Sequence, residues 1–104
     1  MNILIVEGQT ALANLWRRHL ERLGAVVHLA TKQEEAIDLI SENDFEVIVL
    51  DLVLKHGSAL AVSDFAHYRL PSARVVFVTN TSFWKFPSLF YKDCNSQAQK
   101  GNSN

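Results

Sequence analysis

The chain has 104 residues, 48% of them hydrophobic, which is enough for one buried core and leaves little room for a second domain. Its 10 Lys and Arg residues nearly balance 11 Asp and Glu residues, so charge gives no support for direct binding to nucleic acid or to an anionic membrane. One cysteine, no secretory signal pattern and no apolar run near the ~20 residues of a spanning helix predict a cytoplasmic protein.

The first half of the chain alternates strand and helix patterns. An unbroken apolar run at residues 3–6 predicts a strand that is covered on both faces, and an amphipathic pattern over 10–23 predicts the helix that follows it. A short strand is expected at 26–29. Thr31 and Glu34 then have the spacing of a capping box, which predicts the start of a second helix.

The second half repeats this alternation. The apolar run at 47–50 predicts a third strand that ends directly at Asp51, a helical pattern opens at Ser58, and residues 75–78 predict a fourth strand that ends at Thr79. The apolar positions of this third helix are Leu60, Ala61, Phe65 and Tyr68. Strands and helices that alternate through short connections predict an α/β fold, a doubly wound parallel sheet with helices on both faces.

The residues after the fourth strand have a different composition. Aromatic residues gather within a few positions of one another, at Phe83, Trp84, Phe86, Phe90 and Tyr91. Everything after Asp93 is polar, with Asn, Ser, Gln and Gly dominating. We therefore predict a domain at 1–82, followed at 83–104 by an aromatic segment and a disordered polar tail.

Three residues with reactive or polar side chains end predicted strands, and they indicate a site for phosphoryl transfer. Ligands of open α/β sheets bind beyond the carboxyl ends of the strands, so Glu7, Asp51 and Thr79 should converge on one cleft. An Asp carboxylate can take a phosphoryl group when a divalent ion offsets the charge of the incoming oxygens. Mg²⁺ would find suitable oxygens on Glu7, Asp51 and the main-chain carbonyl of Val53, and Thr79 would donate to a phosphoryl oxygen.

The strand ends carry a family resemblance. The segments "ILIVEGQ", "VIVLDLVLKHGSAL" and "RVVFVTN" resemble response-regulator receiver domains of the chemotaxis-regulator type, over residues 1 to about 82. The resemblance implies a flavodoxin-like sheet of order 2-1-3-4 in which a sensor histidine kinase or phosphotransfer protein phosphorylates Asp51. It implies that Thr79 is the switch hydroxyl and that a downstream protein effector receives the signal. It also implies a phosphoacceptor with at most autodephosphorylation, not an enzyme.

The sequence departs from this family pattern in two places. Gly8 stands where receivers have a second acidic residue after the first strand, so Mg²⁺ binding should be weak. The fifth strand, with its Lys and Pro, and the fifth helix are missing or replaced after Asn80. The fourth strand would then be an exposed edge, and we expect self-association, as a dimer, through that edge and the aromatic segment.

Two further functions stay open beside the phosphorylated receiver. One is a pseudo-receiver, an interaction module that regulates partners without being phosphorylated. The other is a flavodoxin-like small-ligand binder that uses the same cleft. The chain has no phosphate-loop motif and no helix-turn-helix, which argues against a nucleotide enzyme and against direct DNA binding. His56 is interpreted as an exposed loop residue, and Trp16 as a core residue.

Overall fold

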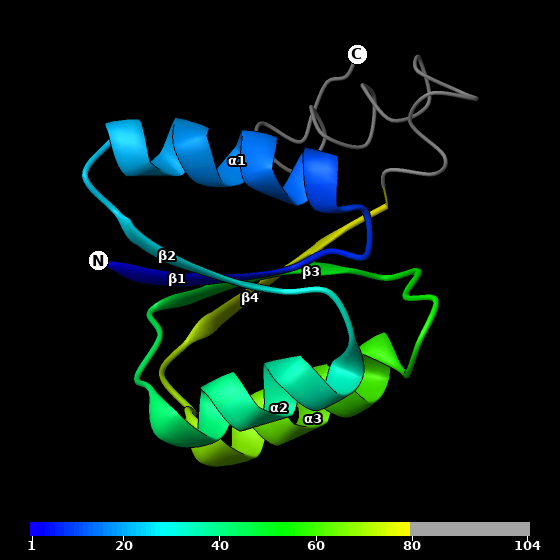
Figure 1. Ribbon diagram of the computed structural model, residues 1–104. Coiled ribbons are helices and arrows are strands. Elements are labelled where there is room, and N and C mark those ends of the chain that lie inside the picture. Colours follow the sequence, from blue (N-terminus) through cyan, green and yellow to red (C-terminus); the bar gives the residue numbers. More distant parts are fainter. Residues whose placement is uncertain (80–104) are drawn as a thin grey trace, which may run out of the picture.

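The computed structural model describes residues 1–79, which form a four-stranded parallel sheet with helices on both faces (Figure 1). In chain order the elements are β1 (Asn2–Val6), α1 (Thr10–Arg22), β2 (Val26–Ala30), α2 (Gln33–Glu42), β3 (Val47–Asp51), α3 (Ala59–Arg69) and β4 (Arg74–Val78). The strand order is β2-β1-β3-β4, which confirms the predicted topology. Within these residues no helix is long and apolar enough to cross a membrane.

The sheet is built around β1, which pairs with β2 on one side and β3 on the other. Val6, its last residue, is in register with Ala30 and Leu50. Residues 3–6 are all buried, because helices cover the strand on both faces. Burial on both faces explains why this strand is a continuous apolar run and does not alternate with polar residues.

Two apolar clusters lie on opposite faces of the sheet. Helices α2 and α3 cover one face and α1 covers the other (Figure 1). The larger cluster, under α2 and α3, includes Leu4, Val6, Ile40, Ile48, Leu50, Val62 and Ala66. The smaller cluster, under α1, has Ile3, Ile5 and Ala13 at its centre with Trp16 and Leu20 packed against them. The side chains of β1 therefore alternate between the two clusters, as the pleat of a strand requires.

The packed face of α3 differs in part from the apolar positions of its sequence pattern. Leu60 and Tyr68, two of those positions, are 67% and 82% exposed. The buried residues of the helix are Ala59, Val62, Ser63 and Ala66. They have the same helical spacing on a different face, and their small side chains let the helix lie close to the sheet. Because α3 carries apolar residues on most of its sides, periodicity alone did not identify the packed face.

The predicted capping box at the start of α2 is also wrong. The partner of Thr31 is Glu35 and not Glu34: the amide and the hydroxyl of Thr31 donate to Oε1 of Glu35, at 2.8 and 3.0 Å. The N-cap position belongs to Lys32, whose side chain makes no capping hydrogen bond. The helix thus begins one residue later than the pattern predicted, and the acidic residue at its third position reaches back across the cap.

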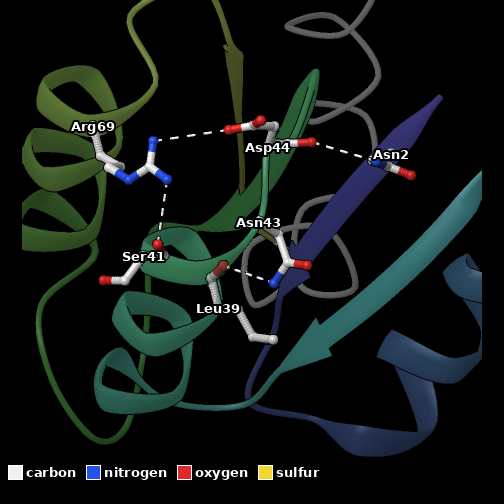
Figure 2. Close-up of polar contacts among 6 residues, drawn as sticks. All are labelled: Asn2, Leu39, Ser41, Asn43, Asp44 and Arg69. Carbon is white, nitrogen blue, oxygen red and sulfur yellow. Dashed lines mark hydrogen bonds and ion pairs between the residues drawn. The ribbon is translucent and has the colours of Figure 1, made fainter.

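Polar contacts tie the helices to the sheet at the amino-terminal ends of the strands (Figure 2). The Arg69 side chain at the end of α3 donates to the Ser41 carbonyl at 3.3 Å and lies 3.8 Å from the Asp44 carboxylate. The Asn2 side chain of β1 donates to the Asp44 carbonyl at 3.4 Å. These contacts join α2, α3 and β1 at the amino-terminal ends of the strands. The predicted site residues lie at the opposite, carboxyl-terminal ends.

Candidate functional site

Glu7 and Asp51 lie side by side at the carboxyl ends of two adjacent strands. Val6 is in register with Leu50, so the next residue of each chain segment is one of the two acids. The Glu7 amide donates to the Ala30 carbonyl at 2.9 Å, which continues the strand ladder through Glu7. Both acids are almost completely buried, with 1% and 2% of their surfaces exposed. The structure therefore brings together the two carboxylates that the sequence placed at strand ends.

Each of these carboxylates is held by a backbone amide two residues further along the chain. The Gln9 amide donates to Oε2 of Glu7 at 3.0 Å, and the Val53 amide donates to Oδ1 of Asp51 at 3.0 Å. Such local hydrogen bonds are typical where a strand turns into a loop. The same local arrangement at both strand ends fixes the orientation of both side chains.

Thr79 follows β4 at the same edge of the sheet. Asp51 is in register with Val78, the last residue of β4, and the Leu52 amide donates to the Val78 carbonyl at 2.9 Å. Thr79 comes directly after Val78 and is half-buried. The three predicted strand ends thus meet along one edge of the sheet, with β3 in the middle between β1 and β4.

The residues at this edge offer oxygen ligands but few charges. Within residues 1–79 no group of three or more His, Cys, Asp or Glu residues gathers in a way that could hold a metal ion. The candidate ligands are the carboxylates of Glu7 and Asp51 and the main-chain carbonyl of Val53. Mg²⁺ accepts a set of this kind, because it uses hard oxygen ligands and keeps several waters. The donor chemistry fits Mg²⁺, with two anionic groups to attract it.

The remaining candidates lie where the sequence suggested. His56 is exposed in the loop after β3, and Trp16 packs against the cluster under α1. His28 is partly buried, with its ring edge-on to Phe45 at a centroid distance of 5.4 Å. The aromatic segment at 83–91, and the region where a fifth strand and its Lys would lie, fall outside the described residues.

A cavity of about 390 Å³ opens beside α1 on the face of the smaller cluster. Its lining is apolar apart from one histidine and consists of Ile5, Leu15, Trp16, His19, Leu20 and Val49. A bound phosphate would require backbone amides or hydroxyls at the ligand, and this lining supplies neither hydroxyls nor a glycine-rich turn. The lining includes none of the three strand-end residues, so this cavity is not the cleft in which a flavodoxin-like ligand is expected.

One residue that contacts the loop after Asp51 had no signal in the sequence. Gln33, the first residue of α2, accepts a hydrogen bond from the Ser58 amide at 2.8 Å through its side-chain oxygen. A glutamine at a helix start is unremarkable in sequence, and its partner is 25 positions away. The nearest hint is Gly57, beside that partner, because glycine permits a turn that other residues resist.

Comparisons of the sequence with known proteins agree on one family. The chain matches the model of the response regulator receiver domain over residues 3–85. It is 34% identical over 61 residues to the transcriptional regulatory protein SrrA of Staphylococcus aureus, a match that covers 59% of this chain and 25% of SrrA. The chain thus spans about a quarter of the length of this curated relative.

Solved structures agree. A response regulator protein from Burkholderia pseudomallei, determined with a phosphorylated aspartic acid, a calcium ion and citrate, has a TM-score of 0.73 and 32% identity, over 75% of this chain and 46% of that one. A CheY-like receiver domain protein from Methanospirillum hungatei has a TM-score of 0.72 and 27% identity, over 75% of this chain and 62% of that one. With the family model matching most of the chain and the sheet order agreeing, the chain belongs to the response regulator receiver domains of two-component systems.

Proposed function

We propose that this receiver domain accepts a phosphoryl group at Asp51 from a sensor histidine kinase or phosphotransfer protein. A downstream protein would then receive the signal through direct contact. The observation that carries this proposal is the pair of buried carboxylates, Glu7 and Asp51, at adjacent ends of β1 and β3. Asp51 supplies the nucleophilic carboxylate, and Glu7 beside it supplies a second carboxylate ligand for the metal ion that such a reaction needs.

The chemistry is a displacement at phosphorus. A carboxylate oxygen of Asp51 forms the new P–O bond while the P–N bond to the donor histidine breaks, and the electron pair stays with the imidazole nitrogen. The Val53 amide holds the Asp51 carboxylate during the approach of the donor. Thr79 would donate its hydroxyl to a phosphoryl oxygen once the adduct exists. The domain acts as an acceptor, with at most the hydrolysis of its own acyl phosphate.

Mg²⁺, held by Glu7, Asp51 and the Val53 carbonyl, would neutralise part of the charge on the phosphoryl oxygens. With two carboxylates at the site among residues 1–79, we expect its affinity to be low. Phosphorylation of this domain should therefore require a higher Mg²⁺ concentration than phosphorylation of a receiver with three acidic ligands.

The test is incubation of the protein with phosphoramidate and Mg²⁺, followed by intact mass measurement. An adduct of one phosphoryl group is expected in the wild type and absent in Asp51→Asn. Asp64→Asn is the matched control, because Asp64 is an exposed aspartate on α3, away from the strand ends. It should form the same adduct as the wild type. Removing Mg²⁺ with a chelator should prevent the adduct in the wild type and in Asp64→Asn.

The second candidate is a pseudo-receiver that regulates a partner without being phosphorylated. The small number of carboxylates at the strand ends favours it. A wild type that stays unmodified at saturating Mg²⁺ would support this candidate and overturn the first. An adduct that persists in Asp51→Asn would place the modification at another residue.

A further inference from the structure

The loop after Asp51 is fixed to the sheet at its near end. It runs from 52 to 58, between β3 and α3, and most of its residues are exposed. The Leu52 amide donates to the Val78 carbonyl at 2.9 Å, and the Val53 amide donates to the Asp51 carboxylate at 3.0 Å. An exposed loop with these contacts alone would be anchored at one end, and loops of that kind open locally at low free-energy cost.

A residue of α2 anchors the far end of this loop. The Gln33 amide donates to the His56 carbonyl at 3.1 Å, and the Gln33 side-chain oxygen accepts from the Ser58 amide at 2.8 Å. Ser58 is also the N-cap of α3. These two hydrogen bonds, which we call the Gln33 latch, join the first residue of α2 to His56 in the loop and to Ser58, the N-cap of α3.

The backbone of the loop packs closely against Gln33 at Gly57. Gly57 has a φ of +113°, a conformation that L side chains rarely adopt. A Cβ at position 57 would also collide with the side chain of Gln33. The loop turns so tightly against Gln33 that position 57 has no room for a side chain, which shows that this contact is closely packed and not incidental.

We propose that Gln33 is a positioning residue that holds residues 52–58, and with them the Val53 carbonyl, in place beside Asp51. This inference rests on the proposed function, because the Val53 carbonyl matters to the site only if Asp51 accepts a phosphoryl group with Mg²⁺ bound. Gln33 acts on the site through the loop. It binds the far end of the loop, at Ser58, while the near end binds the Asp51 carboxylate through the Val53 amide. Its effect should therefore appear in loop opening and in the Mg²⁺ requirement.

The first measurement is native-state hydrogen exchange. Gln33→Leu removes the acceptor at nearly constant size, and the Ser58 amide should then exchange about five- to tenfold faster, the factor expected for the loss of one ordinary hydrogen bond. Gln33→Glu keeps an oxygen at the same reach and should restore slow exchange. Glu34→Leu is the matched control, an exposed neighbour on α2. The amide of Ile48, in the buried strand β3, reports any global loss of stability and should not change.

The second measurement is the rate of phosphorylation by phosphoramidate as Mg²⁺ is varied. Gln33→Leu should raise the Mg²⁺ concentration for half-maximal rate severalfold while the rate at saturating Mg²⁺ stays close to wild type, and Gln33→Glu should reverse this change. A general loss of stability would not produce that split.

The outcomes are separable. Unchanged exchange at Ser58 in Gln33→Leu overturns the latch. Faster exchange with an unchanged Mg²⁺ requirement overturns the positioning role. A wild type that takes no phosphoryl group overturns the proposed function and the positioning role with it, while the exchange measurement still decides whether Gln33 holds the loop.

Discussion

At the residue scale, the buried acids Glu7 and Asp51 give this domain its chemical character. Acidic residues are almost never fully buried unless they are paired or hydrogen-bonded, and each of these two accepts a backbone amide from the residue two positions on. These local hydrogen bonds help to hold the two carboxylates at the carboxyl ends of β1 and β3.

Glu35 gives the molecule a small, testable pH dependence. The amide and hydroxyl of Thr31 donate to its carboxylate and lower its pKa from the ordinary 4.5. Since the unfolded chain then binds the proton more readily than the folded one, this contact stabilises the fold above pH 4.5 and is lost as pH falls through the lower folded pKa. Because Glu35 is exposed, the contribution is about 0.5 kcal/mol or less.

Chemical denaturation at neutral and acidic pH measures this contribution. Glu35→Gln should be less stable than the wild type at pH 7, and the difference should disappear at acidic pH. Thr31→Ala removes the hydroxyl donor but keeps the amide, so its free energy of unfolding at pH 7 should lie between those of the wild type and Glu35→Gln. An equal difference between wild type and Glu35→Gln at both pH values would contradict this account.

At the scale of elements, the loop after β3 and the start of α3 form one structural unit. Ser58 ends the loop, and its side chain accepts from the Ala61 amide at 3.2 Å, which satisfies one of the unpaired amides at the start of the helix. Gln33 holds the backbone of the same residue. Ser58 thus serves both features: its side chain caps α3, and its backbone amide makes one hydrogen bond of the Gln33 latch.

Ser58→Ala separates these two groups. It removes the cap while keeping the backbone amide that Gln33 binds, so the free energy of unfolding should fall by about 1 kcal/mol with the latch intact. Urea denaturation measures the loss, and hydrogen exchange at position 58 checks the latch. Ser72→Ala, in the exposed turn before β4, is the control and should change stability by less than about 0.5 kcal/mol. A Ser58→Ala protein as stable as this control would show that the cap contributes nothing.

At the scale of the whole molecule, β4 is the more exposed of the two outer strands of the sheet. Among residues 1–79, β4 pairs with β3 alone, as β2 pairs with β1 alone, and Val76 and Phe77 of β4 are 46% and 43% exposed. Exposed apolar strands at a sheet edge tend to pair with other chains. We expect copies of this chain to associate through β4, and the contribution expected from the aromatic segment at 83–91 lies outside the described residues.

Sedimentation at micromolar protein concentration tests this expectation. Val76→Lys places a charge on the β4 edge and should shift the population toward monomer. Val26→Lys is the matched control, because Val26 is a 55% exposed valine on β2, the opposite outer strand. It should associate like the wild type. A wild type that is strictly monomeric, or equal effects of both substitutions, would rule out the β4 edge as the contact surface.

The sequence by itself determined the number and order of the elements and the acids at the ends of β1 and β3. These features are local: a strand buried on both faces must be a continuous apolar run, and a residue that ends such a run must lie at the edge of the sheet. The position of Asp51 next to Glu7 then followed from parallel topology, which alternating strands and helices favour.

Only the tertiary structure decided which face of α3 is packed and which residue holds the loop after Asp51. Helix α3 carries apolar side chains on most of its sides, so its sequence pattern is compatible with several orientations on the sheet. Contact with the sheet selects the face with small side chains. The bond from the Ser58 amide to Gln33 joins residues on different elements, 25 positions apart. No local pattern encodes that contact, because it exists only once α2 and α3 lie on the same face of the sheet.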